Sequence, residues 1–325
     1  MNEQIMLSII TPTHDPDLAI FRRTAESVMT LLKKDWEWVV VLHNTDVPGQ
    51  DEFLRLIRES CPSGQTENVR ILTLHDAVRS PAAPRNYGLT QARGKYVCFL
   101  DHDDVLEPAF LLAALQTMEA EDCDVFIGSA KKELTAPGLF EVPVGLDFPN
   151  TGTVYEVPAD PELRGKLLVG AGIMLSCKVI RRDLLMLHEI RFDPDIQLTE
   201  DVLFALRCYC KARKIMVAPH LVAYTYVQNE NSLLQRMMGE DSFPPETYTE
   251  PVRRIVNLAL ENNISPSDYL WMMMGMFTVI YQRGAMAQEK KRLLMSEIQK
   301  YIPLMKLRTR TKKSEAGKAE QHVSQ

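Results

Sequence analysis

Two kinds of hydrophobic pattern alternate along the first 130 residues of the chain, short continuous apolar runs and segments with helical spacing. Short apolar runs have the length and composition of buried strands, and they occupy residues 6–10, 38–42, 69–74, 96–100 and 125–127. Patterns with helical spacing separate these runs, at residues 20–32, 51–58, 84–92 and 109–118. This alternation predicts an α/β protein with a mostly parallel sheet and helices on both faces. The strand ends before residue 105 then meet at one crevice, which is where open parallel sheets bind ligands.

The second part of the chain is less regular. Residues 135–161 contain many Pro and Gly residues and predict a long loop. The pattern then predicts a strand at 172–177, helices at 179–187 and 199–212, strands at 215–217 and 221–227, and helices at 251–261, 266–282 and 288–302. Phe243-Pro244-Pro245 cannot continue a helix. We therefore expect an α/β domain over residues 1–243, an all-helical region over 244–305 and a disordered basic tail over 306–325.

Three carboxylates follow the predicted strand at residues 96–100, at Asp101, Asp103 and Asp104. Carboxylates this close repel one another unless a cation or solvent relieves them. Oxygen ligands suit Mg²⁺ or Mn²⁺, which hold phosphates. The alternative is an acidic turn that caps the helix starting near Pro108, because Asp is a good N-cap and Pro a good first residue.

Composition narrows the class of protein. The net charge of −6, without a basic footprint, argues against nucleic acid as the main partner. No apolar run is long enough to span a bilayer and the N-terminus lacks a charged segment followed by an apolar core, so we expect a cytoplasmic protein. The six cysteines show no Cys-x-x-Cys spacing and do not predict a zinc or disulfide framework.

Four segments then fall into one order: residues 7–14 (LSIITPTH), residues 83–88 (APRNYG), residues 94–104 (GKYVCFLDHDD), and Phe192-Asp193 with Thr199-Glu200-Asp201. In this order they resemble glycosyltransferase family 2 over about residues 6–232. The resemblance implies the Rossmann-like GT-A fold and a nucleoside-diphosphate sugar donor, with UDP favoured. It also implies transfer of one sugar, with inversion, to a hydroxyl of a glycan or lipid-linked saccharide. The Gln-x-x-Arg-Trp sequence of processive synthases is absent, which favours one added sugar over a polymer.

The resemblance implies donor binding by Thr11, Pro12, Thr13, Asn44, Arg85, Asn86, Asp101 and Asp103. The first three would face the base and ribose, although Pro12 also fits a plain strand-to-helix turn. Arg85 lies near a helix start, which is unfavourable for a cation, so we expect it to reach an anion or a base edge. Asn44 stands where the family often has an acidic pair that reads uracil, and its amide can still bind a base edge. Asn86 either binds the nucleotide or caps the helix.

The same resemblance implies a divalent ion, Mn²⁺ or Mg²⁺. Asp103 matches the family's metal-contacting carboxylate, and Asp104 is a further candidate ligand whose alternative is the N-cap described above. Asp101 would contact the ribose, or the metal through water. A divalent ion placed there would stabilise the negative charge on the departing nucleoside diphosphate.

On the acceptor side the resemblance implies Asp201, Glu200 and Gly172. Attack by a sugar hydroxyl needs a base to take its proton, and Asp201 is the expected catalytic base. Acidic residues also stabilise the first turn of a helix, so both interpretations of Thr199-Glu200-Asp201 can hold at once. Gly172 would let a sugar approach the backbone, and a strand-entry turn is the alternative.

The remaining expectations concern partners. A non-catalytic nucleotide-sugar-binding protein of the same fold is the alternative function. The Met-rich residues 271–277 fit either a buried helix or a homodimer surface. The basic residues 308–313 suit peripheral contact with an anionic membrane, and a solvated tail is the alternative.

Overall fold

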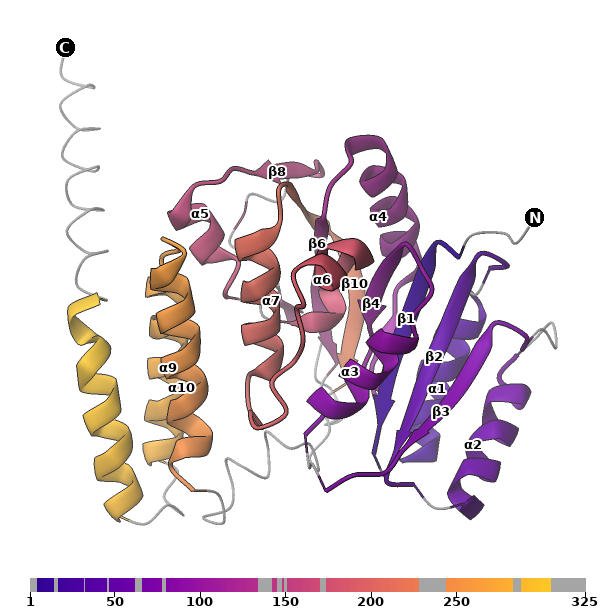
Figure 1. Ribbon diagram of the computed structural model, residues 1–325, viewed down its shortest axis with the longest axis horizontal. Coiled ribbons are helices and arrows are strands. Elements are labelled where there is room, and N and C mark those ends of the chain that lie inside the picture. Colours follow the sequence, from indigo (N-terminus) through magenta and orange to yellow (C-terminus); the bar gives the residue numbers. More distant parts are fainter. Residues whose placement is uncertain are drawn as a thin grey trace.

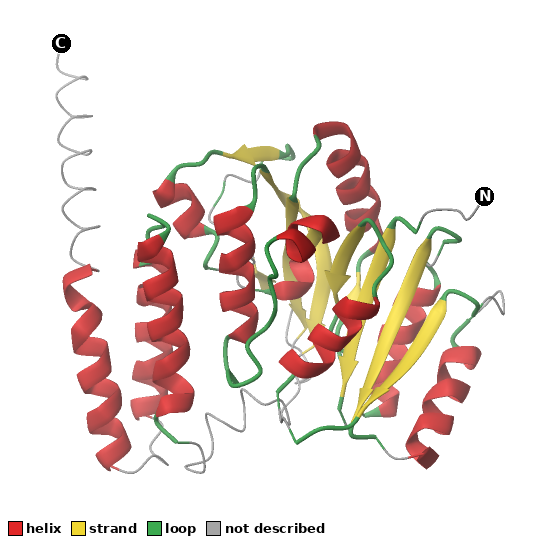
Figure 2. Ribbon diagram, in the orientation of Figure 1, coloured by secondary structure: helices red, strands yellow, loops and turns green. Residues whose placement is uncertain are grey.

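The computed structural model describes residues 5–14, 17–31, 33–45, 47–61, 66–77, 80–133, 142–144, 148, 151–169, 174–227, 244–282 and 288–304. These residues form one sheet flanked by helices (Figures 1 and 2). Its strands lie side by side in the order of residues 69–74, 36–43, 7–13, 96–99, 178–181, 125–133, 215–227 and 105–106. The predicted α/β class, with a mostly parallel sheet and helical C-terminal segments, is confirmed. The expected tail at 306–325 lies outside the described residues.

Four parallel neighbours form one half of the sheet: β1 (Leu7–Thr13), β2 (Trp36–His43), β3 (Val69–Leu74) and β4 (Tyr96–Phe99). The short strand β9 (Lys178–Arg181) lies antiparallel between β4 and β6 (Val125–Glu133). β10 (Ile215–Val227) pairs parallel with β6. Three short strands pair antiparallel with β10 or β6: β5 (Val105–Leu106), β7 (Val142–Val144) and β8 (Tyr155–Val157).

The helices of the α/β part are α1 (Leu18–Met29), α2 (Val47–Glu59), α3 (Ala82–Gln91), α4 (Pro108–Glu121), α5 (Pro161–Lys166), α6 (Arg182–Leu187) and α7 (Glu200–Lys211). α3 covers the front of β1 and β2, and α1 lies behind the same strands (Figure 1). α9 (Glu246–Glu261) and α10 (Ser267–Gln282) lie beyond α7, followed by a helix over residues 288–304.

The first strand runs past its expected end. We expected a turn after Ile10, but β1 continues to Thr13 and Pro12 pairs in register with Val41. Pairing with β4 stops at Ile10, so β1 has a single neighbour at Pro12, and a strand with one neighbour tolerates proline. The interpretation of residues 11–13 as a strand-to-helix turn is therefore wrong.

The segment after residue 174 also differs from expectation. Leu175–Cys177 form a 3-10 helix, η2, instead of a strand, and Lys178–Arg181 form β9 instead of the start of a helix. Four residues are too few for a periodicity, and β9 forms because β4 and β6 each offer it an unpaired edge. The two strands expected between residues 215 and 227 are one strand with shifts in register. α9 begins at Glu246, ahead of the expected start at Pro251.

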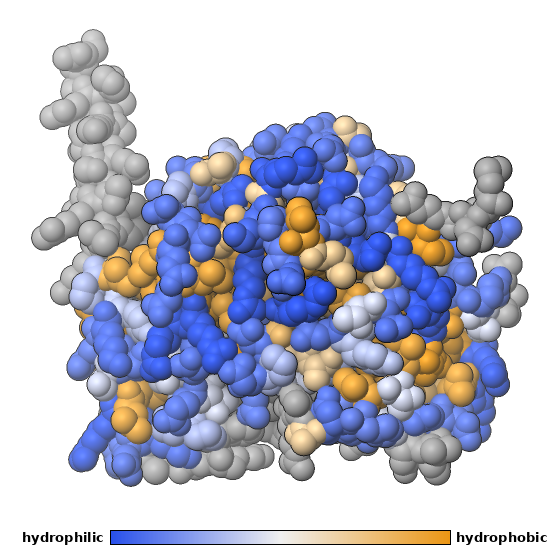
Figure 3. Space-filling model, in the orientation of Figure 1, coloured by the Kyte–Doolittle hydropathy of each residue, from blue (hydrophilic) through white to orange (hydrophobic). Residues whose placement is uncertain are grey.

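The C-terminal helices share the main hydrophobic core. One cluster of buried apolar side chains extends from Leu7 in β1 to Ile298 in the last helix. In α10, Met273 and Phe277 are buried while Trp271 is 50% exposed, so the expectation of a fully buried helix is correct for one face only. Apolar side chains show at the surface over these helices, at the left of Figure 3. Among the described residues, no helix combines the length and apolarity that crossing a bilayer needs.

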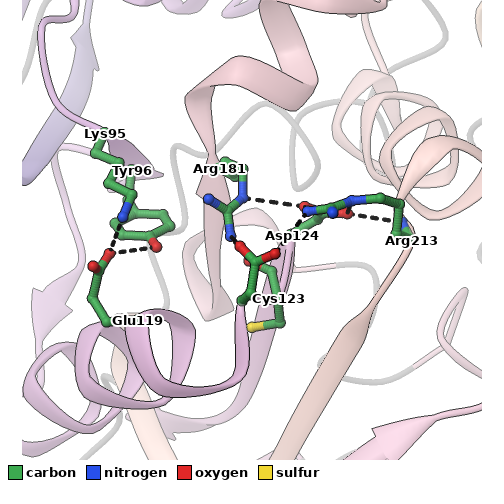
Figure 4. A network of polar contacts seen from close by, with 8 residues as sticks. Lys95, Tyr96, Glu119, Cys123, Asp124, Arg181 and Arg213 are labelled. Atoms are coloured by element: carbon green, nitrogen blue, oxygen red, sulfur yellow. Dashed lines mark hydrogen bonds and ion pairs between the residues drawn. The ribbon is translucent and has the colours of Figure 1, made fainter.

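A polar network ties the sheet together at the amino ends of β4, β6 and β10 (Figure 4). Asp124, with a side chain only 3% exposed, accepts hydrogen bonds from Arg181 Nε at 3.1 Å and Arg213 Nη2 at 2.9 Å. Glu119 accepts hydrogen bonds from Lys95 and Tyr96, both at 2.6 Å. Burial raises the pKa of Asp124, but its bonds with Arg213 and Arg181 outweigh burial and hold that pKa below its usual value.

Replacing the carboxylate of this network should destabilise the fold. We expect Asp124→Asn to lower the free energy of unfolding at pH 7 by about 2 kcal/mol, because the buried side chain loses its charge-assisted hydrogen bonds from Arg181 and Arg213. The depressed pKa means that Asp124 stabilises the fold above the ordinary Asp pKa, about 4. This stabilisation is lost as the pH falls through the folded-state pKa, so the two proteins should converge at low pH. Urea denaturation across pH measures this, with Asp183→Asn, an exposed acid in α6, as control; equal stability at pH 7 would contradict it.

Candidate active site

The candidate residues gather at one edge of the sheet. β1, β2, β3 and β4 run parallel and end there, and the N-terminal end of α7 lies at the same edge (Figure 1). The carboxyl ends of parallel strands supply the ligand crevice in open α/β sheets. The donor-side residues on β1, α3 and the loop after β4 are thereby brought toward Glu200 and Asp201 at the start of α7.

Close packing of α3 on β1 positions the Arg-Asn-Tyr-Gly segment. A Cβ on Gly88 would lie 2.6 Å from Ile10 Cγ2, so only glycine permits this approach. Arg85 lies about one turn earlier on the same helix, and its guanidinium stands 5.5 Å from the Phe192 ring centroid. The glycine thus explains how a helix residue can carry a buried cation into the crevice.

Arg85 joins the donor side to the acceptor side. Its Nη2 donates to Asp101 Oδ1 at 2.6 Å and its Nη1 donates to Glu200 Oε1 at 2.5 Å. The side chain is only 5% exposed, and the neighbouring carboxylates raise the pKa of Arg85 although burial opposes this. We expected Arg85 to reach an anion or a base edge, and in the structure it reaches two carboxylates of the protein, Asp101 and Glu200. Direct contact of Arg85 with the donor stays a prediction.

The acidic run forms a tight loop between β4 and β5. The Asp104 N–H donates to Asp101 O at 3.2 Å, and Thr24 Oγ1 donates to His102 O at 2.9 Å. The Asp101 side chain is 39% exposed and Asp103 is partly exposed. These two carboxylates can meet a ligand from the crevice.

Asp104 behaves differently from its two neighbours. It is 2% exposed and accepts a hydrogen bond from Val227 N at 3.3 Å. Burial raises its pKa well above the usual value, and Asp101 and Asp103 raise it further. The N-cap of α4 is Glu107, so the N-cap alternative for Asp104 is wrong. Its burial makes Asp104 less accessible from the crevice than Asp101 and Asp103.

The carboxylates at the start of α7 have raised pKa values. Burial and the Asp201 charge raise the pKa of Glu200 to about 7, against the effect of Arg85. Burial also raises the pKa of Asp201, and Arg85 and Lys178 oppose this. Asp201 Oδ1 accepts a hydrogen bond from Val202 N at 2.8 Å, which fixes the side chain. A base is most effective when its pKa lies near the working pH, so the raised value suits Asp201 to proton transfer.

The side chains on β1 are occupied inside the fold. Thr11 Oγ1 accepts a hydrogen bond from Trp38 Nε1 at 2.9 Å, and Thr13 Oγ1 donates to Val41 O at 3.2 Å. Both threonines are buried, at 0% and 1% exposure, and Pro12 is buried with them. Contact of these three residues with a base and ribose stays a prediction.

The two asparagines of the donor prediction also have partners. Asn44 is left-handed, with φ 55°, and its Oδ1 accepts a hydrogen bond from Asp76 N at 3.1 Å. Asn86 exchanges two hydrogen bonds of 2.9 Å with the backbone N–H and C=O of Phe192. Asn86 therefore holds the segment before α7, and it does not cap α3, whose N-cap is Pro81. Donor contact by either asparagine stays a prediction.

The sequence did not reveal the contacts of two further side chains at the site. Lys178 is fully buried, donates from Nζ to Met174 O at 2.6 Å and lies near enough to Asp201 for their charges to interact. Its signal was a lysine within the apolar run at 173–180. His43 Nε2 lies 3.0 Å from Asp76 Oδ1, where β2 and β3 end; no local pattern joins these two residues.

The acidic side chains of the crevice decide whether it can hold a metal ion. Among the described residues, no group of three or more His, Cys, Asp or Glu side chains could hold an ion. Mg²⁺ and Mn²⁺ are often bound by one or two carboxylates together with substrate phosphates. Asp103, with Asp101 beside it, fits that mode, and ligation by the buried Asp104 stays a prediction. Gly172, the remaining acceptor-side prediction, lies outside the described residues.

Comparison with known proteins agrees with this geometry. The family model described as "Glycosyl transferase family 2" matches residues 8–186. The succinoglycan biosynthesis protein ExoW of Rhizobium meliloti (strain 1021) is 29% identical over 222 residues, covering 65% of this chain and 66% of ExoW. The poly(ribitol-phosphate) beta-N-acetylglucosaminyltransferase TarS of Staphylococcus aureus (strain MW2) is 25% identical over 251 residues, covering 76% of this chain and 39% of TarS. The chain thus spans less than two thirds of the length of either relative.

A solved structure shows the same fold. The crystal structure of S. aureus TarS 1–349 in complex with UDP-GlcNAc matches with a TM-score of 0.66 and 21% identity, covering 92% of this chain and 81% of that one. The match extends the likeness past the family segment and into the C-terminal helices.

Proposed function

The chain belongs to glycosyl transferase family 2, and on that premise we propose that it transfers one sugar from a UDP-sugar to a hydroxyl of a saccharide or lipid-linked saccharide. The observation that carries the proposal is the buried Arg85, which links Asp101 on the donor side to Glu200 beside the expected base. UDP is supported by the TarS structure, which contains UDP-GlcNAc. A polyhydroxylated acceptor is supported by relatives named for succinoglycan and poly(ribitol-phosphate).

The chemistry follows from the residues at the two sides of the crevice. Asp201 takes the proton of the acceptor hydroxyl while the oxygen of that hydroxyl bonds to the anomeric carbon. The bond from that carbon to the diphosphate breaks, and the electron pair leaves with UDP. One displacement from the side opposite the leaving group inverts the anomeric carbon.

The other carboxylates and the cation shape this reaction. Arg85 favours the charged form of Glu200 next to Asp201, against burial and the Asp201 charge, which together raise the pKa of Glu200 to about 7. Asp103 would hold Mn²⁺ or Mg²⁺ together with the donor diphosphate. When bound, such an ion neutralises the charge that develops on the diphosphate. Asp101, fixed by Arg85, is placed to accept a hydrogen bond from the donor ribose.

The function is tested by incubating the protein with Mn²⁺ and a panel of UDP-sugars, and by measuring release of UDP with and without saccharide acceptors. We expect one or a few donors to be hydrolysed slowly and an acceptor to accelerate the release. Binding of UDP without turnover of any donor would favour the non-catalytic alternative. Absence of UDP binding at millimolar concentration would overturn the proposal.

The metal assignment has its own prediction. We expect Asp103→Ala to abolish the Mn²⁺-dependent part of UDP binding, because the ion loses its protein ligand, while the fold is retained. Isothermal calorimetry with and without Mn²⁺ measures this, and Asp51→Ala, which removes an exposed acid of α2, is the control. Unchanged metal-dependent affinity in a folded Asp103→Ala protein would move the ligand elsewhere.

A further inference from the structure

The loop over residues 192–199 carries the acceptor-side pair, because it leads directly into Glu200 and Asp201 at the start of α7. The α/β part fixes one side of this loop. Asn86 holds the backbone of Phe192 through two hydrogen bonds of 2.9 Å, and Ser80 Oγ donates to Ile196 O at 3.0 Å. Both anchors belong to α3 and its preceding turn, which also supply Arg85.

Arg254 of α9 binds two carboxylates of the same loop. Its Nη2 and Nη1 donate to the two oxygens of Asp195 at 2.6 and 3.2 Å, and Nη1 also lies 3.3 Å from Asp193 Oδ2. Glu250 accepts from Arg254 Nε at 2.9 Å and so orients the guanidinium. Arg207 of α7 completes the cluster with two bonds of 2.9 Å to Asp193. A planar guanidinium that donates several hydrogen bonds in fixed directions restricts the position of its partners more strictly than a single ion pair does.

Tyr269 of α10 reaches the end of the loop. Thr199 immediately precedes Glu200 and has φ 60°, a left-handed conformation that is uncommon for a β-branched residue. Within the described part of the chain, the buried Thr199 and Tyr269 hydroxyls have no partner at ordinary hydrogen-bond geometry. Thr199 is nevertheless near enough to lower the pKa of Tyr269, against the burial that raises it. Tyr269 is 0% exposed, so its ring is packed inside the fold.

We propose that α9 belongs to the acceptor-side machinery, with Arg254 as a positioning residue for Glu200 and Asp201. In this arrangement the loop is held by hydrogen bonds from α3 and its preceding turn and by hydrogen bonds from α9. α7 lies between the C-terminal helices and the sheet (Figure 1). The family segment at residues 8–186 contains neither the loop nor Arg254. The inference rests on the proposed function, since Asp201 acts there as the base.

The test compares neighbouring arginines on α9. Arg254→Met removes the hydrogen bonds to the loop, whereas Arg253→Met removes ion pairs to Glu250 and Glu297, which both lie in the C-terminal helices. Displacing a catalytic group by about 1 Å can cost roughly 10²-fold in rate. We therefore expect Arg254→Met to lower kcat by about tenfold or more, with the KM for donor and the affinity for UDP within about twofold of wild type. Arg253→Met should leave all three near wild type.

Tyr269→Phe in α10 provides a second control, because it keeps the ring and its packing and removes a hydroxyl that has no partner at ordinary hydrogen-bond geometry among the described residues. We expect kcat and UDP affinity near wild type. The proposal is overturned if Arg254→Met transfers sugar at the wild-type rate, or if Arg253→Met loses as much kcat as Arg254→Met.

Amide hydrogen exchange separates this inference from the proposed function. The amides of residues 199–203 should exchange faster in Arg254→Met than in wild type or Arg253→Met, whether or not a substrate has been found. Unchanged exchange there overturns the positioning role itself. Faster exchange in a protein that turns over no UDP-sugar leaves the positioning role in place and overturns the proposed function instead.

Discussion

The Asp201→Asn protein should bind UDP as wild type does and transfer sugar at least about 10²-fold more slowly, which is the usual scale of general base catalysis. The reason is chemical, since the amide cannot accept the proton of the acceptor hydroxyl. The substitution keeps the shape of the side chain, and the oxygen that accepts from Val202 N is retained. Initial rates of UDP release with acceptor, together with calorimetry of UDP, measure the two parts separately.

The control for this substitution is Asp183→Asn, which neutralises another first-turn acid at the start of α6. It should leave transfer unchanged. Full activity of Asp201→Asn would place the base elsewhere. Loss of UDP affinity together with transfer would show that Asp201 mainly supports the helix start.

The second large effect should follow from removing the buried cation. We expect Arg85→Met to lower the free energy of unfolding by about 3 to 5 kcal/mol, because it leaves the buried Glu200 without its counter-charge. Arg55→Met removes an arginine that is 71% exposed and pairs only at 3.7 and 3.9 Å. That control should change stability by less than about 0.5 kcal/mol. Urea denaturation at pH 7 gives both values.

A compensating substitution sharpens this prediction. Adding Glu200→Gln to Arg85→Met removes the stranded charge and should restore part of the lost stability. If the double variant were no more stable than Arg85→Met, the stabilising role of Arg85 would lie in packing against Phe192. An Arg85→Met protein as stable as wild type would show that Glu200 does not need the cation.

Local patterns predicted the first half of the sheet well. The apolar run at 69–74 coincides with β3, and the run at 96–100 differs from β4 by one residue. Lys178–Arg181 were misassigned because a four-residue strand that starts with a buried lysine has no readable period. The partners that decide its structure, β4 and β6, come from distant parts of the chain.

The site shows the same division between local and distant information. The Asp101 run and the Glu200-Asp201 pair could be found because their residues are adjacent and follow a recognisable order. The bridge through Arg85 could not be specified, since its two carboxylates lie 16 and 115 positions away. The grip of Arg254 on Asp195, across 59 positions, carries no motif at all.

The place of β9 in the sheet has a consequence for the order of folding. β1 to β4 are consecutive along the chain and can pair as soon as they are synthesised, but the other edge of β4 receives its partner only from residues 178–181. At 5 to 20 residues per second, the roughly 80 residues between them take about 4 to 16 s on the ribosome. During that interval Tyr96–Phe99, all buried in the finished protein, present an open apolar strand edge. The nascent chain is therefore most exposed to aggregation before residue 181 emerges, and a chaperone that acts on it has its target at β4.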